Sequence, residues 1–295
     1  MTNYDRSALT FLKEFPSMEV QEKKEYTFGL ILIGDELLSG RRADKHLPKV
    51  IELLGKRGQS LSWMHCVGDD PGRITQELEQ AFASGDIVFS CGGIGSTPDD
   101  HTRQCAAKAL GLPLEMHPQA KKLILERARD VAKQKGQAYD ENSQEAINRL
   151  NMGVFPKGAS IIPNPYNKIP GFSIHHIYFF PGFPVMAWPM MEWVLEHDYG
   201  AHLQPVAHAE RAIVVYGIGE AALTPLMQQI EADHPGAKIF SLPSVDHPTY
   251  GAHIELGVKG EPALVDQVFH LMIEKLNTLP LHLGPELVQK RNGGA

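Results

Sequence analysis

The sequence predicts an α/β protein, with an open, mostly parallel, doubly wound sheet at 26–200 and a smaller α+β domain at 208–280. Two almost continuous apolar runs, at 26–33 (YTFGLILI) and 86–89 (DIVF), are typical of parallel strands that are buried on both faces of a sheet. Amphipathic helical segments alternate with these runs, which is the pattern of right-handed β-α-β units. A length of 295 residues accommodates two such domains.

Strands and helices alternate regularly through the first part of the chain. A polar N-terminal extension at 1–25 precedes strands at 26–33, 60–67 and 86–89, which are separated and followed by helices at 44–57, 71–83 and 104–110. The strand at 60–67 is less apolar than the others, which favours a place near the edge of the sheet. Asp35 and Glu36 directly follow the first strand. They therefore lie where open α/β sheets bind ligands, beyond the carboxyl ends of the strands.

A glycine-rich segment, 90–102 (SCGGIGSTPDDHT), joins the third strand to the next helix. Thr97 suits the N-cap of that helix, Pro98 the first helical position, and the two following aspartates the first turn. The glycines of this segment allow backbone N–H groups to approach a ligand, and a helix start adds partial positive charge. These features predict a phosphate site.

Asp99 and Asp100 modify that prediction, because carboxylates repel phosphate unless a divalent cation or a basic side chain lies between them. The segment is therefore predicted to be a metal-assisted phosphate site. An alternative stays open: a glycine-rich turn of this kind can serve only as a tight connection, with aspartates that complement the helix dipole.

The second half of the main domain is less regular. Helices are predicted at 118–135 and 140–150, strands at 159–163 and 174–180, and a last helix at 185–195. His175 and His176 are adjacent on the predicted strand, so they point to opposite faces and cannot chelate one metal ion. The last helix carries large apolar side chains for which core packing is favoured over an oligomer interface, namely Trp188, Met190, Met191 and Trp193.

The small domain is predicted from its order of elements. A strand at 211–216, a helix at 220–232, strands at 238–242 and 253–258, and a helix at 262–279 follow one another. This β-α-β-β-α order is typical of a small split α+β unit. A tail at 281–295 completes the chain.

The composition argues against several classes of function. A net charge of −7 without a long Lys/Arg cluster argues against nucleic-acid binding. The three cysteines have no CxxC spacing, which predicts a reducing compartment, by default the cytoplasm, and no structural zinc. Neither a signal peptide nor a run of membrane-spanning length is present in the sequence, so no membrane partner is expected.

Five short motifs carry a family resemblance. They are Gly34-Asp35-Glu36-Leu37-Leu38-x-Gly40 with Asp44, Val67-Gly68-Asp69-Asp70, Gly92-Gly93-x-Gly95-x-Thr97-x-Asp99-Asp100-x-Thr102-Arg103, Pro163-Asn164-Pro165 with Pro170-Gly171-Phe172, and Phe180-Pro181-Gly182-x-Pro184. Together they resemble the competence/damage-inducible protein A (CinA) family over about residues 26–197, and the small domain resembles the middle domain of that family. The C-terminal nicotinamide-nucleotide amidase domain of longer CinA proteins has no counterpart in these residues.

The resemblance implies a fold shared with molybdopterin adenylyltransferases. It also implies two activities, namely metal-dependent hydrolysis of ADP-ribose at its pyrophosphate and adenylyl transfer onto molybdopterin. Both are attacks at a phosphorus atom, and both require that the phosphates be held and their charge neutralised. We expect a divalent metal ion (Mg, Mn or Co), a nucleotide or pterin phosphate as ligand, a homo-oligomer, and room for a separately encoded amidase partner.

The same resemblance assigns roles to individual residues. The expected catalytic residues are Asp35, Glu36, Asp99 and Asp100, of which Asp35 and Asp100 are also the expected metal ligands. The expected binding residues are Gly92, Gly93, Gly95, Ser96, Thr97, Asp44 and Lys168.

The chain departs from the family pattern in the loops that frame the ligand. Ser96 replaces the usual Pro, Lys45 and His46 replace Ser or Thr and then Asn, and Asn167 and Lys168 replace Gly and Thr. The two lysines offer cationic contacts to phosphate, or the departures alter the activity. Hydrolysis of ADP-ribose-like nucleotides is the leading hypothesis; the alternatives are a molybdopterin adenylyltransferase-like role and nucleotide or pterin-phosphate binding without turnover.

Overall fold

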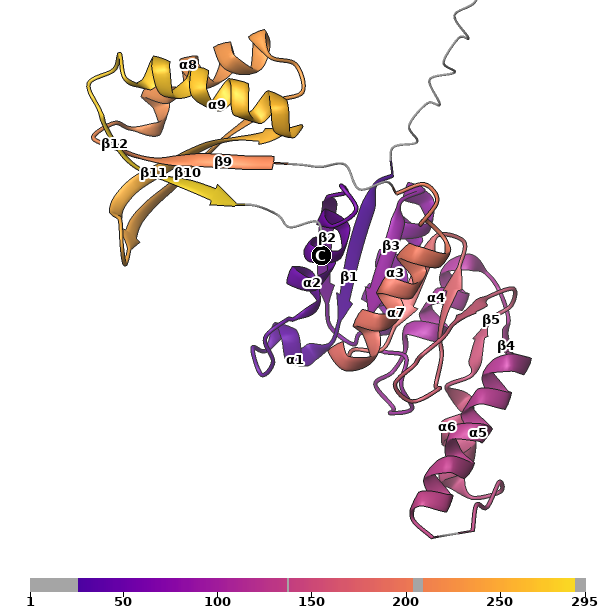
Figure 1. Cartoon of the computed structure of the whole chain (residues 1–295). Helices are drawn as coiled ribbons and strands as arrows, with labels where there is room; N and C mark the ends of the chain where they lie inside the picture. The colour runs from indigo at the N-terminus through magenta and orange to yellow at the C-terminus, as the bar shows by residue number, and fades with distance from the viewer. Residues whose placement is uncertain (1–25, 137, 204–208, 290–295) are drawn as a thin grey trace, which may run out of the picture.

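The computed structural model describes residues 26–136, 138–203 and 209–289. These residues form two units (Figure 1). One is a six-stranded mixed sheet with helices on both faces, and the other is a four-stranded antiparallel sheet with helices on one face. The extension expected at 1–25 lies outside the described residues.

The main sheet is parallel in its first part and antiparallel at its far edge. Its strands, in spatial order, are β2 (Leu61–Val67), β1 (Phe28–Ile33), β3 (Ile87–Cys91), β8 (Ile177–Phe180), β7 (Gly171–Ile174) and β6 (Ser160–Ile162). The first four are parallel, whereas β7 and β6 pair antiparallel. Every residue of β1 is buried, and β2 lies at an edge with partly exposed side chains, which confirms both predictions.

Helices cover both faces of this sheet. They are α1 (Asp35–Leu38), α2 (His46–Gly55), α3 (Pro71–Ser84), α4 (Thr102–Leu110), α5 (Pro118–Gln134), α6 (Gln144–Asn151) and α7 (Pro184–His197). A short two-stranded sheet of β4 (Leu114–Met116) and β5 (Val154–Pro156) lies beside α4.

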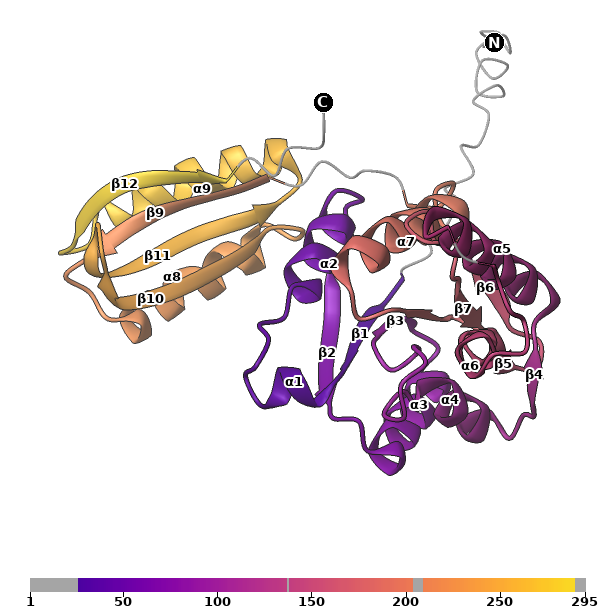
Figure 2. The same cartoon turned by 90° about the horizontal axis from the view of Figure 1, so that it is seen from below.

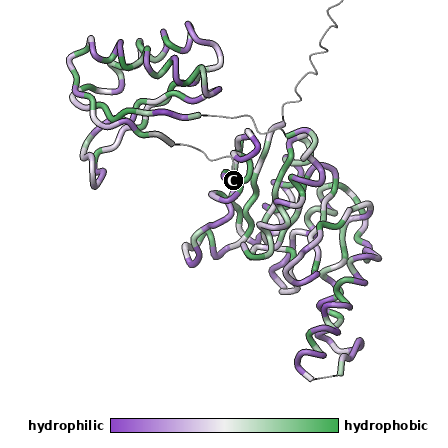
Figure 3. Tube along the Cα trace, in the orientation of Figure 1, coloured by the Kyte–Doolittle hydropathy of each residue, from purple (hydrophilic) through white to green (hydrophobic). Residues whose placement is uncertain are grey.

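Alternate residues of β1 enter two separate cores. Leu30 and Leu32 pack with side chains of α2 and α7, whereas Ile31 and Ile33 pack with side chains of α3 and α4. Figure 2 shows these two pairs of helices on opposite sides of the sheet, and Figure 3 shows the hydrophobic residues gathered along its strands. This arrangement is a doubly wound α/β fold, so the predicted fold class is confirmed.

The helix after the glycine-rich segment begins later than the sequence predicts. α4 begins at Thr102 with His101 as its N-cap, so the N-cap expected at Thr97 is wrong. Residues 97–100 form a turn instead, in which the Asp100 N–H donates to the Thr97 carbonyl at 3.1 Å. Proline in second position suits a tight turn as well as it suits a helix start. Asp99 and Asp100 therefore precede the helix.

The single strand expected at 174–180 is wrong. β7 ends at Ile174 and pairs antiparallel with β8, which begins at Ile177, so His175 and His176 form the turn of a hairpin. His175 has a φ of 53°, the left-handed conformation that two-residue hairpin turns require. The expectation that the two histidines lie on opposite faces of a strand is wrong for the same reason.

The last helix of the main domain packs as expected. Met190 and Met191 of α7 are fully buried, and Trp188 and Trp193 pack against the same core. None of the helices in the described ranges is long and apolar enough to span a membrane. The three cysteines of the chain are free thiols.

The small domain has one more strand than predicted. Its elements are β9 (Ala209–Tyr216), α8 (Glu220–Asp233), β10 (Lys238–His247), β11 (Gly251–Gly260), α9 (Pro262–Leu276) and β12 (His282–Gln289). The strand order is β10-β11-β9-β12, and side chains of both helices form one core with the sheet. β12 pairs antiparallel with β9, so the tail expected from 281 is wrong over this strand.

Candidate functional site

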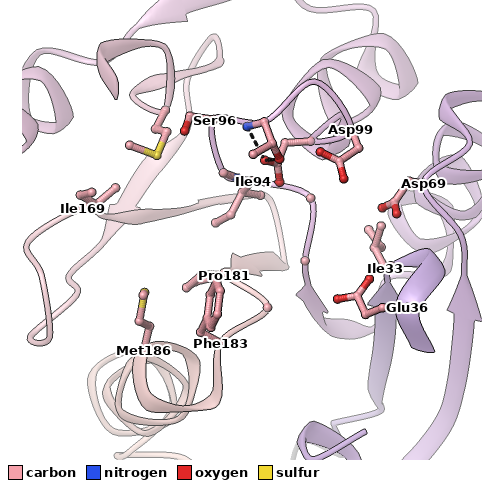
Figure 4. A pocket seen from close by; sticks show the side chains of 18 of the residues that line it. Ile33, Glu36, Asp69, Ile94, Ser96, Asp99, Ile169, Pro181, Phe183 and Met186 are labelled. Carbon is pink, nitrogen blue, oxygen red and sulfur yellow. Dashed lines mark hydrogen bonds between the residues drawn. The ribbon is translucent and has the colours of Figure 1, made fainter. Parts of the chain in front are cut away.

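A hollow of the main domain lies beyond the carboxyl ends of its central parallel strands. It is a pocket of about 700 Å³, lined by residues that directly follow β1, β3 and β8, including Gly34, Gly92 and Pro181. Figure 4 shows acidic side chains at one end of this pocket and apolar side chains at the other. The position is the one that the sequence predicts from the β-α-β pattern.

Residues 92–101, here called the glycine loop, approach their neighbours too closely for a side chain. A Cβ atom on Gly92 would lie 2.2 Å from the carbonyl oxygen of Ile33, and one on Gly93 would lie 2.2 Å from Oγ1 of Thr102. Both glycines have positive φ, 111° and 67°. Only glycine satisfies both the backbone conformation and the spacing here.

Three side chains at the end of the glycine loop hold its backbone. Asp100 accepts hydrogen bonds from the N–H groups of Gly95 and Thr97, both at 2.8 Å, and from Oγ1 of Thr97. Thr102 Oγ1 donates to the Gly92 carbonyl at 3.0 Å. Arg103 donates to the carbonyl of Ile94 at 2.5 Å. The loop is therefore preorganised by bonds that the chain makes with itself.

Arg103 performs this task from inside the protein. Its side chain is 5% exposed, and burial lowers the pKa of the guanidinium while the neighbouring Asp100 carboxylate raises it. A buried cation needs a nearby counter-charge, and Asp100 supplies it. Asp100 thus has a structural task in addition to the metal-binding role predicted for it.

Some donors of the glycine loop remain unused. No described residue accepts a hydrogen bond from the backbone N–H of Gly93, Ile94 or Ser96. Gly93, Ile94 and Ser96 all line the pocket. Free N–H groups on a rigid loop are the elements of an anion site, as the sequence predicts.

Three carboxylates, Glu36, Asp69 and Asp99, line the pocket and are here called the acidic wall. They come from α1, the segment after β2 and the glycine loop, and Figure 4 shows them gathered at the same end. Asp69 was absent from the predicted site residues. Its only signal in the sequence was its place after an edge strand, in the Val67-Gly68-Asp69-Asp70 motif.

Asp69 is held by a reciprocal pair of hydrogen bonds with Asp35. The N–H of Asp35 donates to Oδ2 of Asp69 at 2.9 Å, and the N–H of Asp69 donates to Oδ1 of Asp35 at 3.2 Å. The end of β1 and the end of β2 are thereby joined. A side chain on Gly68 would lie 2.3 Å from Oδ1 of Asp35, so the pair also explains this glycine.

The acidic wall contains more negative charge than its surroundings neutralise. Burial raises the pKa of Asp69, and the carboxylates of Asp35, Glu36 and Asp99 raise it further, against a hydrogen bond from the Asp35 backbone. Among the described residues, the one ion pair that the wall makes joins Glu36 to Arg42 at a long 3.9 Å. Excess negative charge of this kind favours a bound cation.

Protein ligands alone do not complete a metal site here. Across residues 26–136, 138–203 and 209–289, no group of three or more His, Cys, Asp or Glu side chains is placed to hold a metal ion. Magnesium is commonly held by one or two carboxylates together with phosphate oxygens of a substrate. The acidic wall fits that kind of site rather than a closed protein cage.

Arginines and apolar side chains, which the sequence did not single out, line the rest of the pocket. Arg41 and Arg42 reach it from the segment between α1 and α2, and Arg42 lies 5.8 Å from the ring centre of Phe183. At the opposite end from the acidic wall, the apolar lining includes Ile169 and Met186. The pocket therefore combines charged and apolar ends, as required by a ligand with phosphates and a flat ring.

Two of the predicted binding residues have other partners. Asp44 accepts hydrogen bonds from the N–H groups of His46 and Leu47, at 2.8 and 2.9 Å, and so caps the start of α2. Lys168 is paired with Asp130 of α5 at 2.8 Å and is absent from the pocket lining. Ser96 and Thr97 line the pocket. Asp35 does not line it, but its backbone N–H donates a hydrogen bond to Asp69, which does.

Comparison with known proteins relates the main domain to a family. A family model described as "Probable molybdopterin binding domain" matches residues 29–200. A CinA-like protein of Anaeromyxobacter dehalogenans is 30% identical over 215 residues, which are 71% of this chain and 50% of the relative. The chain thus spans about half the length of that relative.

Two further similarities cover different shares of the chain. A protein of Pyrobaculum arsenaticum is 27% identical over 261 residues, which are 85% of this chain and 95% of the relative. The crystal structure of a protein CinA with unknown function from Thermoplasma acidophilum is 24% identical, with a TM-score of 0.49, covering 58% of this chain and 98% of that one.

Proposed function

This chain belongs to the family of probable molybdopterin binding domains, and from that premise we propose that it hydrolyses the pyrophosphate of ADP-ribose-like nucleotides with a divalent metal ion. One observation carries the proposal. The under-neutralised acidic wall and the unused N–H groups of the glycine loop line the same pocket of about 700 Å³. A metal-bound diphosphate matches both.

Each part of the pocket suits one part of such a substrate. The N–H groups of Gly93, Ile94 and Ser96 are positioned for phosphate oxygens, and Arg41 and Arg42 add cationic groups that bind phosphate well. The apolar end around Ile169 and Met186 suits the base. A pocket of about 700 Å³ lies within the range that binds such small molecules.

One or two of the carboxylates Glu36, Asp69 and Asp99 would hold the metal ion, together with the substrate's phosphate oxygens. The ion would neutralise phosphate charge and lower the pKa of a bound water. Asp69, whose pKa is raised by burial and by neighbouring carboxylates, is suited to accept a proton from the attacking water. The water oxygen bonds to phosphorus, the bond to the bridging oxygen breaks, and the products are AMP and ribose 5-phosphate.

The test is release of AMP from ADP-ribose by the purified protein in the presence of magnesium, manganese or cobalt. Asp69→Asn retains an oxygen for the Asp35 N–H but removes the charge, so we expect turnover to fall by about 10²–10⁴-fold. Glu79→Gln is the control, because Glu79 is an exposed carboxylate of α3 outside the pocket. Equal turnover in the two variants, or turnover without a divalent metal, contradicts the proposal.

One alternative is adenylyl transfer onto molybdopterin, which uses the same phosphate and metal groups; the family description names molybdopterin binding. Consumption of ATP with release of pyrophosphate in the presence of molybdopterin identifies that activity. Nucleotide binding without any turnover identifies a binding role.

A further inference from the structure

The loop between β6 and β7, residues 163–170, borders the apolar end of the pocket and contains two asparagines. Both of them line the pocket; Asn164 is 5% exposed, whereas Asn167 is only partly buried. Ile169 of the same loop lies at the apolar end in Figure 4. Asn167 therefore brings a polar side chain to the end of the pocket that suits the base of a nucleotide.

Backbone groups of the loop determine which way each side-chain amide points. Oδ1 of Asn164 accepts a hydrogen bond from the N–H of Tyr166 at 3.0 Å, so its NH2 group faces the other way. That NH2 group donates to the carbonyl of Ile169 at 2.9 Å and to Oδ1 of Asn167 at 2.8 Å. Oδ1 of Asn167 also accepts from the N–H of Ile169, at 3.0 Å. Since a backbone N–H only donates, these bonds identify the oxygen of each amide.

The oxygen of Asn167 is fully used, whereas its NH2 group is not. An amide oxygen has two lone pairs, and both are taken by donors of the loop. Among the described residues, the NH2 group donates to Sδ of Met186 at 3.5 Å, and a thioether is a weak acceptor. Met186 also lies at the apolar end of the pocket. Asn167 thus offers donors, and no acceptor, to a ligand at this end.

The amide of Asn167 cannot turn over to offer its oxygen instead. A flipped amide would place its NH2 group against the N–H of Ile169 and the NH2 of Asn164, donor against donor. The loop is also tied to α5, because Lys168 forms an ion pair with Asp130 at 2.8 Å. The polarity that Asn167 presents is therefore fixed before a ligand binds.

We propose that Asn167 selects a base with a carbonyl oxygen, as in the 6-oxopurines hypoxanthine and guanine, over adenine. In a 6-oxopurine, O6 and the neighbouring N7 are both acceptors and can take both N–H groups of Asn167. Adenine has an amino group in place of O6, which needs an acceptor that Asn167 does not have.

This inference rests on the proposed function, because it assumes that the base lies at the apolar end of the pocket. It narrows the ADP-ribose-like substrates to those in which a 6-oxopurine replaces adenine. Asn167 stands where the family usually has Gly, so this selection belongs to this chain in particular.

Titration calorimetry with ADP and with IDP (inosine diphosphate), each in the presence of magnesium, tests the inference. The two ligands share the ribose and the diphosphate, and IDP has an oxygen at position 6 of the purine where ADP has an amino group. We expect the wild-type protein to bind IDP about tenfold more tightly than ADP, because only IDP satisfies both donors.

Asn167→Asp is the decisive variant, because it keeps an oxygen for the donors of Ile169 and Asn164 and puts an acceptor in place of the NH2 group. We expect the preference to reverse, so that ADP binds more tightly than IDP. The added charge weakens both ligands alike, since they carry the same diphosphate. Asn148→Asp, at an exposed position of α6 outside the pocket, adds the same charge and leaves the preference for IDP unchanged.

Each result decides one point. Equal affinity of the wild-type protein for the two ligands, or an unchanged preference in Asn167→Asp, overturns the inference, even in a protein that releases AMP from ADP-ribose. A preference for IDP that Asn167→Asp abolishes supports it. If that same protein releases neither AMP from ADP-ribose nor IMP from inosine diphosphate ribose, the base selection stands and the proposed hydrolysis is overturned. Failure to bind either nucleotide overturns both.

Discussion

The glycine loop and the acidic wall lie in one pocket but differ in how their polar groups are satisfied. In the loop, Asp100 and Arg103 hold backbone groups in place, and the N–H groups of Gly93, Ile94 and Ser96, which line the pocket, have no acceptor among the described residues. In the wall, like charges crowd together and raise the pKa of Asp69. The backbone of the loop is thus held in place in the free protein, whereas the crowded carboxylates of the wall destabilise it, a cost that the proposed cation would relieve.

This contrast predicts opposite effects of substitution. Changes that damage the loop destabilise the whole domain, because its bonds are part of the fold. Neutralising the wall stabilises the free protein while it removes function.

The largest effect is expected from Arg103→Met. The substitution removes the buried donor of the Ile94 carbonyl and the counter-charge of Asp100, so the free energy of unfolding falls by about 2–4 kcal/mol. Urea denaturation followed by circular dichroism measures the loss. Arg73→Met, at an exposed position of α3, is the matched control and changes stability by less than about 0.5 kcal/mol. Equal losses in the two variants would show that Arg103 does not hold the loop.

A smaller loss is expected from Gly93→Ala, for which the chain offers a matched control. Gly93 and Gly111 have nearly the same φ, 67° and 64°, but only at Gly93 does a Cβ meet an atom, Oγ1 of the buried Thr102 at 2.2 Å. Gly111→Ala therefore costs about 1 kcal/mol of backbone strain. Gly93→Ala costs about 1–2 kcal/mol more and weakens nucleotide binding.

Thermal unfolding and calorimetry test this pair of glycine variants. Comparable stability of Gly93→Ala and Gly111→Ala would contradict the packing of the loop. Unchanged nucleotide affinity in Gly93→Ala would contradict its place in the binding site.

The smallest effect is expected at Asp69, with the opposite sign. A raised pKa means that the folded protein holds this proton where the unfolded chain has released it, so stability falls as pH rises through the folded pKa. Asp69→Asn removes that penalty and raises Tm at pH 7. The gain disappears as the pH approaches the ordinary aspartate value of about 4. Measuring Tm of both proteins from pH 3 to 8 tests the sign, and a Tm difference that does not vary with pH argues against an under-neutralised wall.

The buried parallel strands and the position of the pocket were predictable, because apolar runs and the residues after them are local signals. The turn at His175 and His176 was not, because it contains no Gly, Asn or Asp and interrupts a run of strand-forming residues. Thr97-Pro98-Asp99 carries the same signal for a helix start and for a turn. β12 was missed because Gly284 and Pro285 interrupt its pattern.

The site itself was only partly predictable for a different reason. The glycines and the acids of the loop are contiguous in sequence, whereas the role of Asp69 depends on Asp35, 34 residues earlier. In the same way, Lys168 forms an ion pair with Asp130 and does not line the pocket. Asp130 is 38 residues away in sequence, so no local pattern indicates this partner. Such long-range pairs follow from tertiary structure.

The reciprocal bonds between Asp35 and Asp69 have a consequence for how sequences of this kind diverge. Each side chain accepts from the backbone of the other, so replacing either one by an apolar residue leaves an N–H of its partner position unpaired. Substitutions at the two positions are therefore not additive, because the effect of a change at one depends on the residue at the other. Relatives that lack one of these aspartates are expected to lack the other as well. The two positions, which follow two neighbouring strands, would then covary in an alignment.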